Sequence, residues 1–230
     1  MKGRTEKVSV FCLLLAGVLG TQAEEPDLSP TALVADKDGK VLYVACETAG
    51  SILAFDTGSE KVTARYPAGQ VSCLALSPDQ ERLFATAGSF NGRLLEIGLK
   101  SGKTLRELPA GHTPESPVLS ADGQTLYYCN RFSRADRKDI HALDVATGKV
   151  KCSAKAIREP ATMRLSKDGQ TLWVGNYLPL MPANSQRVYA SLCVYDSATL
   201  EKVATLDLPG GAFAVCDSAM SADGKHYFVS

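Results

Sequence analysis

Three arginines have side chains suited to binding an anion, and a glutamate follows one of them in the chain. Arg131 and Arg134 follow a strand-like segment, and Arg158 and Glu159 lie in a later connection. Guanidinium groups bind carboxylates and phosphates through charge-assisted, often paired hydrogen bonds. The same residues fit a second role, in which an Arg–Glu pair ties two neighbouring repeats together and binds no ligand. Both interpretations stay open at this point.

The histidines and asparagines give weaker signals. His112 lies in a connection, where it fits either a ligand to haem or a metal, or a solvated side chain. His141 and His226 fall in strand-like segments, so we expect them to pack. Asn130 and Asn176 occupy equivalent positions at strand ends, where an amide caps loop backbone groups or contacts a ligand.

Tyr177 opens a long irregular segment, residues 177–190. A segment of this kind fits a lid or a partner-binding loop, and it fits a tolerated insertion equally well.

Two segments look like ligand-binding motifs but lack the required spacing. GLKSGKT (98–104) has one residue too few between its glycines for a phosphate-binding loop. DKDG (36–39) lacks the glutamate that closes a calcium loop. Both fit hairpin turns. The chain also has no nucleophile elbow and no convincing triad, so we predict no catalytic residue and no metal site.

Six cysteines lie beyond the N-terminal segment. They are Cys46, Cys73, Cys129, Cys152, Cys193 and Cys216. An even number permits disulfides in an oxidising compartment, while free cysteine also packs as a small apolar residue in strands. None belongs to a CxxC pair, so the chain has no c-type haem-attachment motif and we predict no cofactor within it.

The elements that carry these residues recur along the chain. LSADGQTLYYCNRF (119–132) nearly repeats as LSKDGQTLWVGNYL (165–178), with eight of fourteen positions identical. Alignment on the turn gives five copies, with aspartates at Asp38, Asp79, Asp122, Asp168 and Asp223. Each copy is a strand, a polar turn and a strand, with Pro, Asp and Gly supplying the turn conformation.

A second hairpin follows in four of the copies. These hairpins span 52–66, 93–107, 140–154 and 191–205. Two hairpins make four strands per repeat, which is the unit of a β-propeller blade. The strands are near-continuous apolar runs, as in ILAF and LCVY, which is typical of strands covered on both faces. No helical pattern separates them, so the fold class is all-β.

The repeated SxDG-xxLY pattern, the LYVA segment before Cys46 and the DxxTGKV turn resemble the YVTN-type β-propeller repeat proteins of bacteria. They are also similar to the propellers of quinoprotein amine dehydrogenases and the haem d1 domain of nitrite reductases. The resemblance covers residues 30–230. More narrowly, CNRFS (129–133), IREP (157–160) and NYLP (176–179) are similar to a subgroup often joined to c-type cytochrome domains. That likeness implies haem in a partner or a downstream domain.

These patterns predict a β-propeller of four-stranded antiparallel blades, in which four blades are followed by the first hairpin of a fifth. The blade boundaries are about 30–68, 69–112, 113–158 and 159–210, with the partial blade at 211–230. The resemblance implies a seven-bladed ring, and ring closure removes exposed strand edges. We therefore expect the chain to be the N-terminal part of a longer protein, a small closed ring being the alternative.

Residues 1–23 have the pattern of an export signal. A basic start, an apolar run (8–20) and small residues ending at Ala23 follow in order, and the run is too short to span a membrane. An uncleaved anchor or a buried helix is the alternative. We therefore expect residues 24–230 to form a propeller domain that is periplasmic, extracellular or at the cell surface.

Charge excludes one class of partner. The chain has 25 basic and 25 acidic residues, and the predicted signal holds three of the basic and one of the acidic, so its removal leaves a formal charge of −2. No basic stripe remains to neutralise phosphates, which argues against a nucleic-acid partner. No second apolar run approaches membrane length either.

The loops of a propeller divide between two faces. Turns within hairpins form one face, here called the turn face, and connections between hairpins and between blades form the other, the long-loop face. The turns of this chain are short and repetitive, whereas the connections are longer and individual. Because binding residues usually sit on such loops, the long-loop face is the candidate binding face.

Three functions remain open. The first is an exported binding scaffold that takes a protein or small-molecule ligand and performs no chemistry of its own. The alternative is the propeller part of a periplasmic redox protein partnered with, or fused to, a c-type cytochrome. A propeller lactonase ranks third, because no catalytic residues of that class can be mapped onto this chain.

Overall fold

The computed structural model describes residues 27–132, 138–156, 159–177, 190–208 and 214–230. Strands β1 to β18 are the regular elements of these residues, and the all-β prediction is confirmed. None of the described segments forms an apolar helix long enough to cross a membrane. The predicted export signal, together with Arg134 and Arg158, lies outside the described residues.

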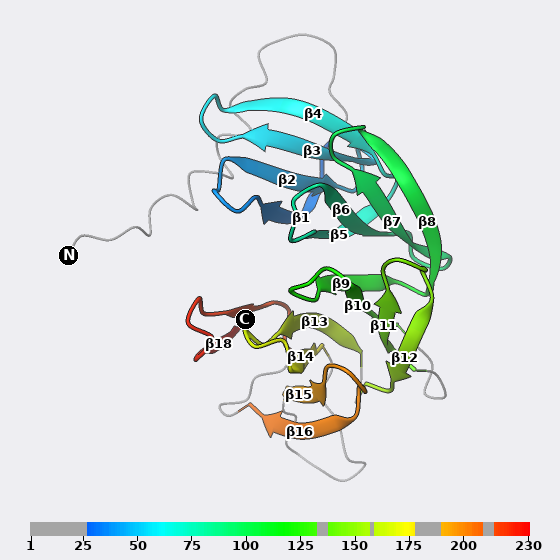
Figure 1. Ribbon diagram of the computed structural model, residues 1–230, viewed down its shortest axis with the longest axis vertical. Helices are drawn as coiled ribbons and strands as arrows, with labels where there is room; N and C mark the ends of the chain where they lie inside the picture. The colour runs from blue at the N-terminus through cyan, green and yellow to red at the C-terminus, as the bar shows by residue number, and fades with distance from the viewer. Residues whose placement is uncertain (1–26, 133–137, 157–158, 178–189, 209–213) are drawn as a thin grey trace, which may run out of the picture.

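The strands form four antiparallel sheets of four strands each and one hairpin, always in chain order (Figure 1). The first blade is β1 (Pro30–Ala35), β2 (Val41–Cys46), β3 (Ser51–Asp56) and β4 (Lys61–Pro67). The second is β5 (Val71–Leu76), β6 (Arg82–Ala87), β7 (Gly92–Gly98) and β8 (Lys103–Gly111). The third is β9 (Pro114–Leu119), β10 (Thr125–Asn130), β11 (Ile140–Asp144) and β12 (Val150–Ala154). The fourth is β13 (Pro160–Leu165), β14 (Thr171–Asn176), β15 (Ser191–Asp196) and β16 (Lys202–Asp207), and the hairpin is β17 (Ser218–Met220) with β18 (Tyr227–Val229).

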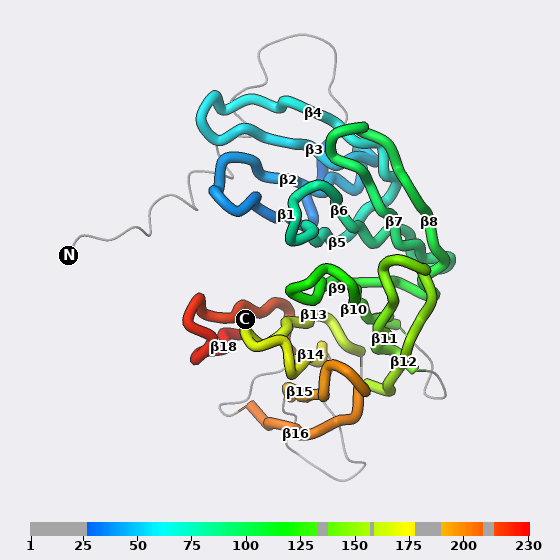
Figure 2. Tube along the Cα trace, viewed as in Figure 1, coloured from blue at the N-terminus to red at the C-terminus, as the bar shows by residue number. Residues whose placement is uncertain are grey.

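The blades follow one another around an arc, and each contacts the next through its first strand (Figure 2). Side-chain hydroxyls join these inner strands in sequence. Thr31 Oγ1 donates to the Val71 carbonyl at 3.2 Å, and Ser72 Oγ donates to the Pro114 carbonyl at 3.4 Å. The Met163 amide donates to Ser116 Oγ at 2.7 Å, and the Thr162 and Ser218 hydroxyls lie 2.7 Å apart. Every blade-to-blade step within the described residues is therefore bridged by a hydroxyl.

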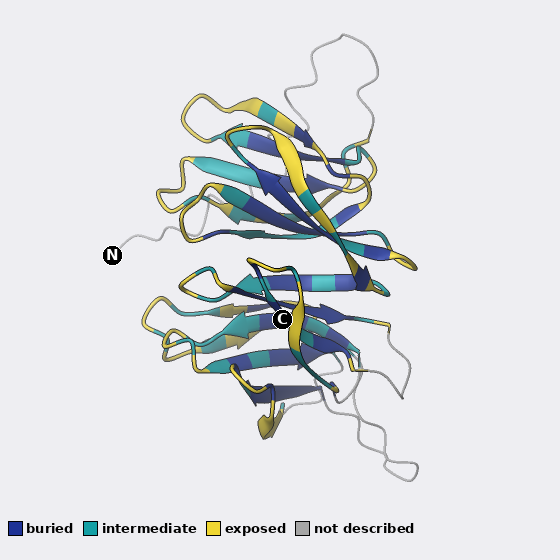
Figure 3. Ribbon diagram, turned by 45° about the vertical axis from the view of Figure 1, so that its right-hand side comes forward, coloured by how far each residue is buried: buried dark blue, intermediate teal, exposed yellow. Residues whose placement is uncertain are grey.

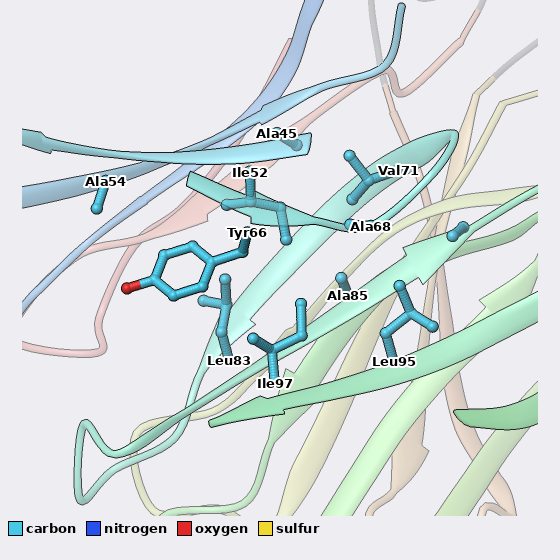
Figure 4. Close-up of a cluster of buried hydrophobic side chains, with 11 residues drawn as sticks. Ala45, Ile52, Ala54, Tyr66, Ala68, Val71, Leu83, Ala85, Leu95 and Ile97 are labelled. Atoms are coloured by element: carbon cyan, nitrogen blue, oxygen red, sulfur yellow. The ribbon is translucent and has the colours of Figure 1, made fainter. Parts of the chain in front are cut away.

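Apolar side chains fill the spaces between blades. Figure 4 shows Ile52 and Tyr66 of the first blade packed against Val71, Leu83 and Ile97 of the second. All six residues of β10 are buried, whereas all six of the outermost strand β16 are exposed (Figure 3). The apolar runs lie in the middle strands, where they are largely buried, and the outermost strand of the fourth blade carries no such run.

The SxDG motif forms the same hydrogen-bonded turn in its three copies, and Ser77-Pro78-Asp79-Gln80 forms that turn with Gln80 in place of the glycine. In one copy, Ser166 Oγ donates to Asp168 Oδ1 at 2.6 Å, the Gln170 amide donates to the same carboxylate at 3.1 Å, and the Thr171 amide donates to Ser166 Oγ at 2.9 Å. The same bonds recur at Ser77–Asp79, Ser120–Asp122 and Ser221–Asp223. These hydrogen bonds hold the pKa of each aspartate below its usual value. The motif is therefore structural.

Backbone contacts separate the two faces as the pattern predicts. On the long-loop face, the Gly50 carbonyl accepts from the Gly69 amide at 3.0 Å, which joins a connection within a blade to one between blades. On the turn face, the Thr57 amide donates to the Lys40 carbonyl at 2.8 Å, which joins the two turns of one blade.

Candidate binding site

A pocket of about 540 Å³ opens where the second and third blades meet. Strands β8, β10 and β11 supply Pro109, Ala110, Gly111, Tyr128, Asn130 and His141. The neighbouring connections supply Phe90, His112, Phe132 and Lys138, which places the pocket at the long-loop face. Pockets of this size, lined by aromatic rings and a few polar groups, are typical of small-molecule sites.

Asn130 and His141 form the fixed polar wall of the pocket. Asn130 Nδ2 donates to the carbonyls of Ala110 at 2.6 Å and His112 at 3.1 Å. Its Oδ1 therefore faces His141 Nε2, 2.8 Å away, and accepts a hydrogen bond from it. His141 Nδ1 then accepts from the Ser153 hydroxyl, also at 2.8 Å. Both ring nitrogens are occupied, so His141 is not free to ligate a metal.

The imidazole of His141 is uncharged at neutral pH. Burial lowers the pKa of His141 to about 4, and the nearby Lys138 charge acts in the same direction. The ring stacks on Tyr128, with centroids 4.8 Å apart and an angle of 26° between the planes. Burial alone raises the pKa of Tyr128 to about 12. Its hydroxyl therefore stays protonated, and the residue lines the pocket.

Three rings form the outer rim. The His112 ring lies edge-on to Phe90, with centroids 5.0 Å apart, and to Phe132 at 6.4 Å. The Thr113 hydroxyl lies 2.9 Å from His112 Nδ1, and Nε2 has no partner among the described residues. Phe90 is 80% exposed and Phe132 is 50% exposed, so both rings are presented to solvent and not to the core.

Arg131 lies at the next junction, between the third and fourth blades. Its Nη1 is 3.3 Å from Glu115 Oε1, and its guanidinium lies 4.2 Å above the centre of the Tyr177 ring. It also lies 5.4 Å from the centre of the Phe132 ring, which places it beside the pocket rim. Burial raises the pKa of Glu115, and the Arg131 charge opposes that shift. Because Tyr177 belongs to the fourth blade, Arg131 connects two blades through Tyr177 while its carboxylate partner stays within its own blade.

The other candidate residues are more scattered. Asn176 is completely buried in the fourth blade, where its Nδ2 donates to the Ser191 carbonyl at 3.2 Å. The Glu159 carbonyl accepts from the Tyr177 amide at 2.8 Å. Arg134 and Arg158 are outside the described residues, so their pairing stays a prediction. Of the eight candidates, the structure brings His112 and Asn130 into the pocket, with Arg131 and Tyr177 close to its rim.

Of the ten pocket residues, sequence reasoning singled out only His112 and Asn130 as candidates for a site. Phe90, Tyr128, Phe132 and Lys138 were not candidates, and His141 was expected only to pack against its neighbours. The signal that could have found them is two phenylalanines in polar connections that flank His112 along the chain. The placement of His226 in a strand is wrong, since this residue precedes β18 and is exposed.

The six cysteines are free thiols in the structure, and none is paired. Cys46, Cys129 and Cys193 are buried, and burial raises the pKa of each thiol. Among the described residues, no group of three His, Cys, Asp or Glu side chains is arranged to hold a metal ion.

No protein-family model matches the chain, and no curated protein matches it. Solved structures do. A hydrazine synthase from Kuenenia stuttgartiensis aligns with a TM-score of 0.77 and 20% identity, covering 92% of this chain and 58% of that one. The chain is built of β-propeller blades. The propeller spans little more than half the length of that structure, and at this identity the likeness concerns the fold alone.

Proposed function

We propose that the protein is an exported, YVTN-like propeller that acts as a binding scaffold and takes its ligand on the long-loop face. The pocket between the second and third blades carries this proposal. It combines a rigid polar wall, in which Asn130 and His141 hold each other, with the exposed rings of Phe90 and Phe132. Rings exposed to this degree in a monomer commonly mark an interaction site.

The rest of the long-loop face supports a binding role without chemistry. The polar atoms of the Asn130 amide and of the His141 ring are hydrogen-bonded to backbone and side-chain partners. Neither group is therefore free to move a proton at neutral pH. Arg131 is committed to Glu115 and to the Tyr177 ring. These residues build and hold a surface, which is the task of a scaffold.

A small-fragment screen by ligand-observed NMR tests this role. Hits are mapped by amide shifts, and we expect them at His112, Tyr128 and Phe132 on the long-loop face. F132A should weaken the hits at least tenfold. L105A is the matched control, because Leu105 is 56% exposed on β8 but does not line the pocket. Hits confined to the turn face, or no hits at all, would contradict the proposal.

A second candidate is the propeller part of a periplasmic redox protein that works with a c-type cytochrome domain. The likeness of CNRFS (129–133) and IREP (157–160) to the cytochrome-joined subgroup supports it. In this case the haem belongs to a partner or to a downstream domain. An absorption spectrum of the protein purified from its natural source tests the idea. A haem Soret band that co-purifies with the chain favours it, and a colourless complex at full occupancy counts against it.

A further inference from the structure

We propose that the pocket at the junction of the second and third blades binds a small planar carboxylate, an aromatic acid of one or two rings. This inference rests on the binding role proposed above and names the ligand class for the same site.

Charge is the first argument. The pocket lining contains one cation, Lys138, and no carboxylate, although the chain as a whole has as many acidic as basic residues. The Lys138 ammonium forms no ion pair with a described residue, whereas Arg131, beside the Phe132 ring, is paired with Glu115. A ligand with a negative charge is therefore favoured in this pocket, and a ligand with a positive charge is repelled.

Hydrogen-bonding capacity is the second argument. The Asn130 amide and both nitrogens of His141 are already used within the protein. The polar atoms left for a ligand are the Tyr128 hydroxyl, the Lys138 ammonium and His112 Nε2. Nε2 carries the proton when the Thr113 hydroxyl donates to Nδ1. Lys138 can only donate, the Tyr128 hydroxyl can donate, and Nε2 donates in this tautomer, so the matching ligand group is an acceptor such as a carboxylate.

Shape is the third argument. The rings of Phe90, His112, Phe132 and Tyr128 line the pocket together with the small residues Ala110 and Gly111 of β8. Aromatic rings pack best against another planar group, either offset-stacked or edge-on. A phosphate would find only one ammonium here and no cluster of arginines. A flat apolar ligand that carries one carboxylate contacts both the aromatic rings and the hydrogen-bond donors of the lining.

The test compares three probes of equal shape at pH 7 and low salt. These are 2-naphthoate, the neutral 2-naphthamide and the cationic 2-naphthylmethylamine, titrated by calorimetry and by NMR on the full protein. We expect naphthoate to bind at least tenfold more tightly than naphthamide and to shift the Tyr128 and His112 resonances. K138Q should abolish this preference. K61Q, at an exposed lysine on β4, should keep it.

The outcomes separate this inference from the proposed function. If naphthamide or the amine binds this pocket as tightly as naphthoate, the ligand class is wrong and the binding role stands. If K138Q keeps the preference for the acid, the carboxylate does not bind here and the inference is also wrong. If none of the three probes shifts a long-loop resonance and the fragment screen is empty too, both proposals fail. Y128F gives a check that leaves the fold intact, since it removes one donor and should weaken naphthoate several-fold without a change in melting temperature.

Discussion

The Nε2 atom of His141 lies 2.8 Å from Oδ1 of Asn130, on the neighbouring strand of the same blade. Asn130 belongs to the third blade, yet its amide holds the carbonyls of Ala110 and His112 at the end of the second. The neutral ring of His141 therefore fixes the side chain that closes the junction. Protonation of Nδ1 would add a second N–H to that ring, and the Ser153 hydroxyl, which donates to the neutral ring, would have to turn and accept.

His141 should make the protein less stable in acid. Its pKa is about 4 in the folded state, against the ordinary histidine value of 6.5 that applies once the chain unfolds. Between these values the unfolded state binds more protons, so the stability from this group is complete above pH 6.5 and is lost as the pH falls toward 4. The loss is about 3 kcal/mol. H141Q should remove this loss of stability in acid, as measured by urea unfolding at pH 7, 6, 5 and 4. An unchanged pH slope in H141Q would contradict the assignment.

Asp139 should change the stability of the protein with pH in the opposite direction to His141. This residue is 5% exposed, its Oδ1 has no hydrogen-bond partner among the described residues, and burial raises its pKa to about 6. Between pH 4 and 6 the folded state holds the proton more tightly, so stability from this group falls as the pH rises. We expect D139N to be more stable than the wild type at pH 7 and about equal at pH 4. The same urea series measures both variants, and a D139N curve parallel to the wild type would refute the prediction.

Glu96 should be the most sensitive carboxylate in the second blade. It accepts from Arg82 at 3.0 Å and from Arg106 at 2.6 Å, and Arg106 also donates to the Ala146 carbonyl of the third blade at 3.2 Å. E96A removes the carboxylate paired with Arg106, while Arg82 keeps only its 3.5 Å contact with Asp79. The expected cost is about 2–3 kcal/mol, less than for a fully buried pair because both arginines still reach water.

Glu107 is the matched control for this variant. Its pair with Arg93 is also 3.0 Å long, but both side chains are at least 40% exposed. E107A should cost less than about 1 kcal/mol, as exposed pairs usually do. Equal losses for E96A and E107A in chemical denaturation would show that the Glu96 network does not join the blades.

Gly92 should not tolerate even a methyl group. A Cβ at this position would lie 2.1 Å from Cδ of Pro114 in the next blade and 2.7 Å from the Gly111 carbonyl oxygen. G92A must push the second and third blades apart, at a cost of about 1–3 kcal/mol or more. Gly58 is the control, because its Cβ would meet nothing closer than 3.6 Å. Thermal melting should show a large decrease for G92A and almost none for G58A, and equal decreases would exclude the steric explanation.

The turns could be predicted because their contacts are local. Ser166, Asp168 and Thr171 make their hydrogen bonds within a few residues of one another, so the motif is visible in any one copy and its repetition reveals the blades. The apolar runs of the middle strands could be predicted equally well, because a strand buried on both faces shows no alternation of apolar and polar residues.

The pocket could not be predicted in the same way. Phe90, Tyr128 and Lys138 come from three separate segments that meet only when two blades pack. A histidine in a strand, such as His141, has the same local pattern whether it packs or lines a site. Its role depends on Asn130 and Ser153, and neither is adjacent to it in the chain.

The hydroxyl bridges between inner strands have a consequence for how the molecule unfolds. Across blades, Thr31, Ser72 and Ser116 each reach only the next blade, so within the described residues these bridges couple blades that are not adjacent only through the blades between them. Free energy then adds as a linear series of single-blade terms and nearest-neighbour terms. Weakening one junction divides such a series into two cooperative blocks. Hydrogen exchange would show this as two protection levels on either side of the damaged step.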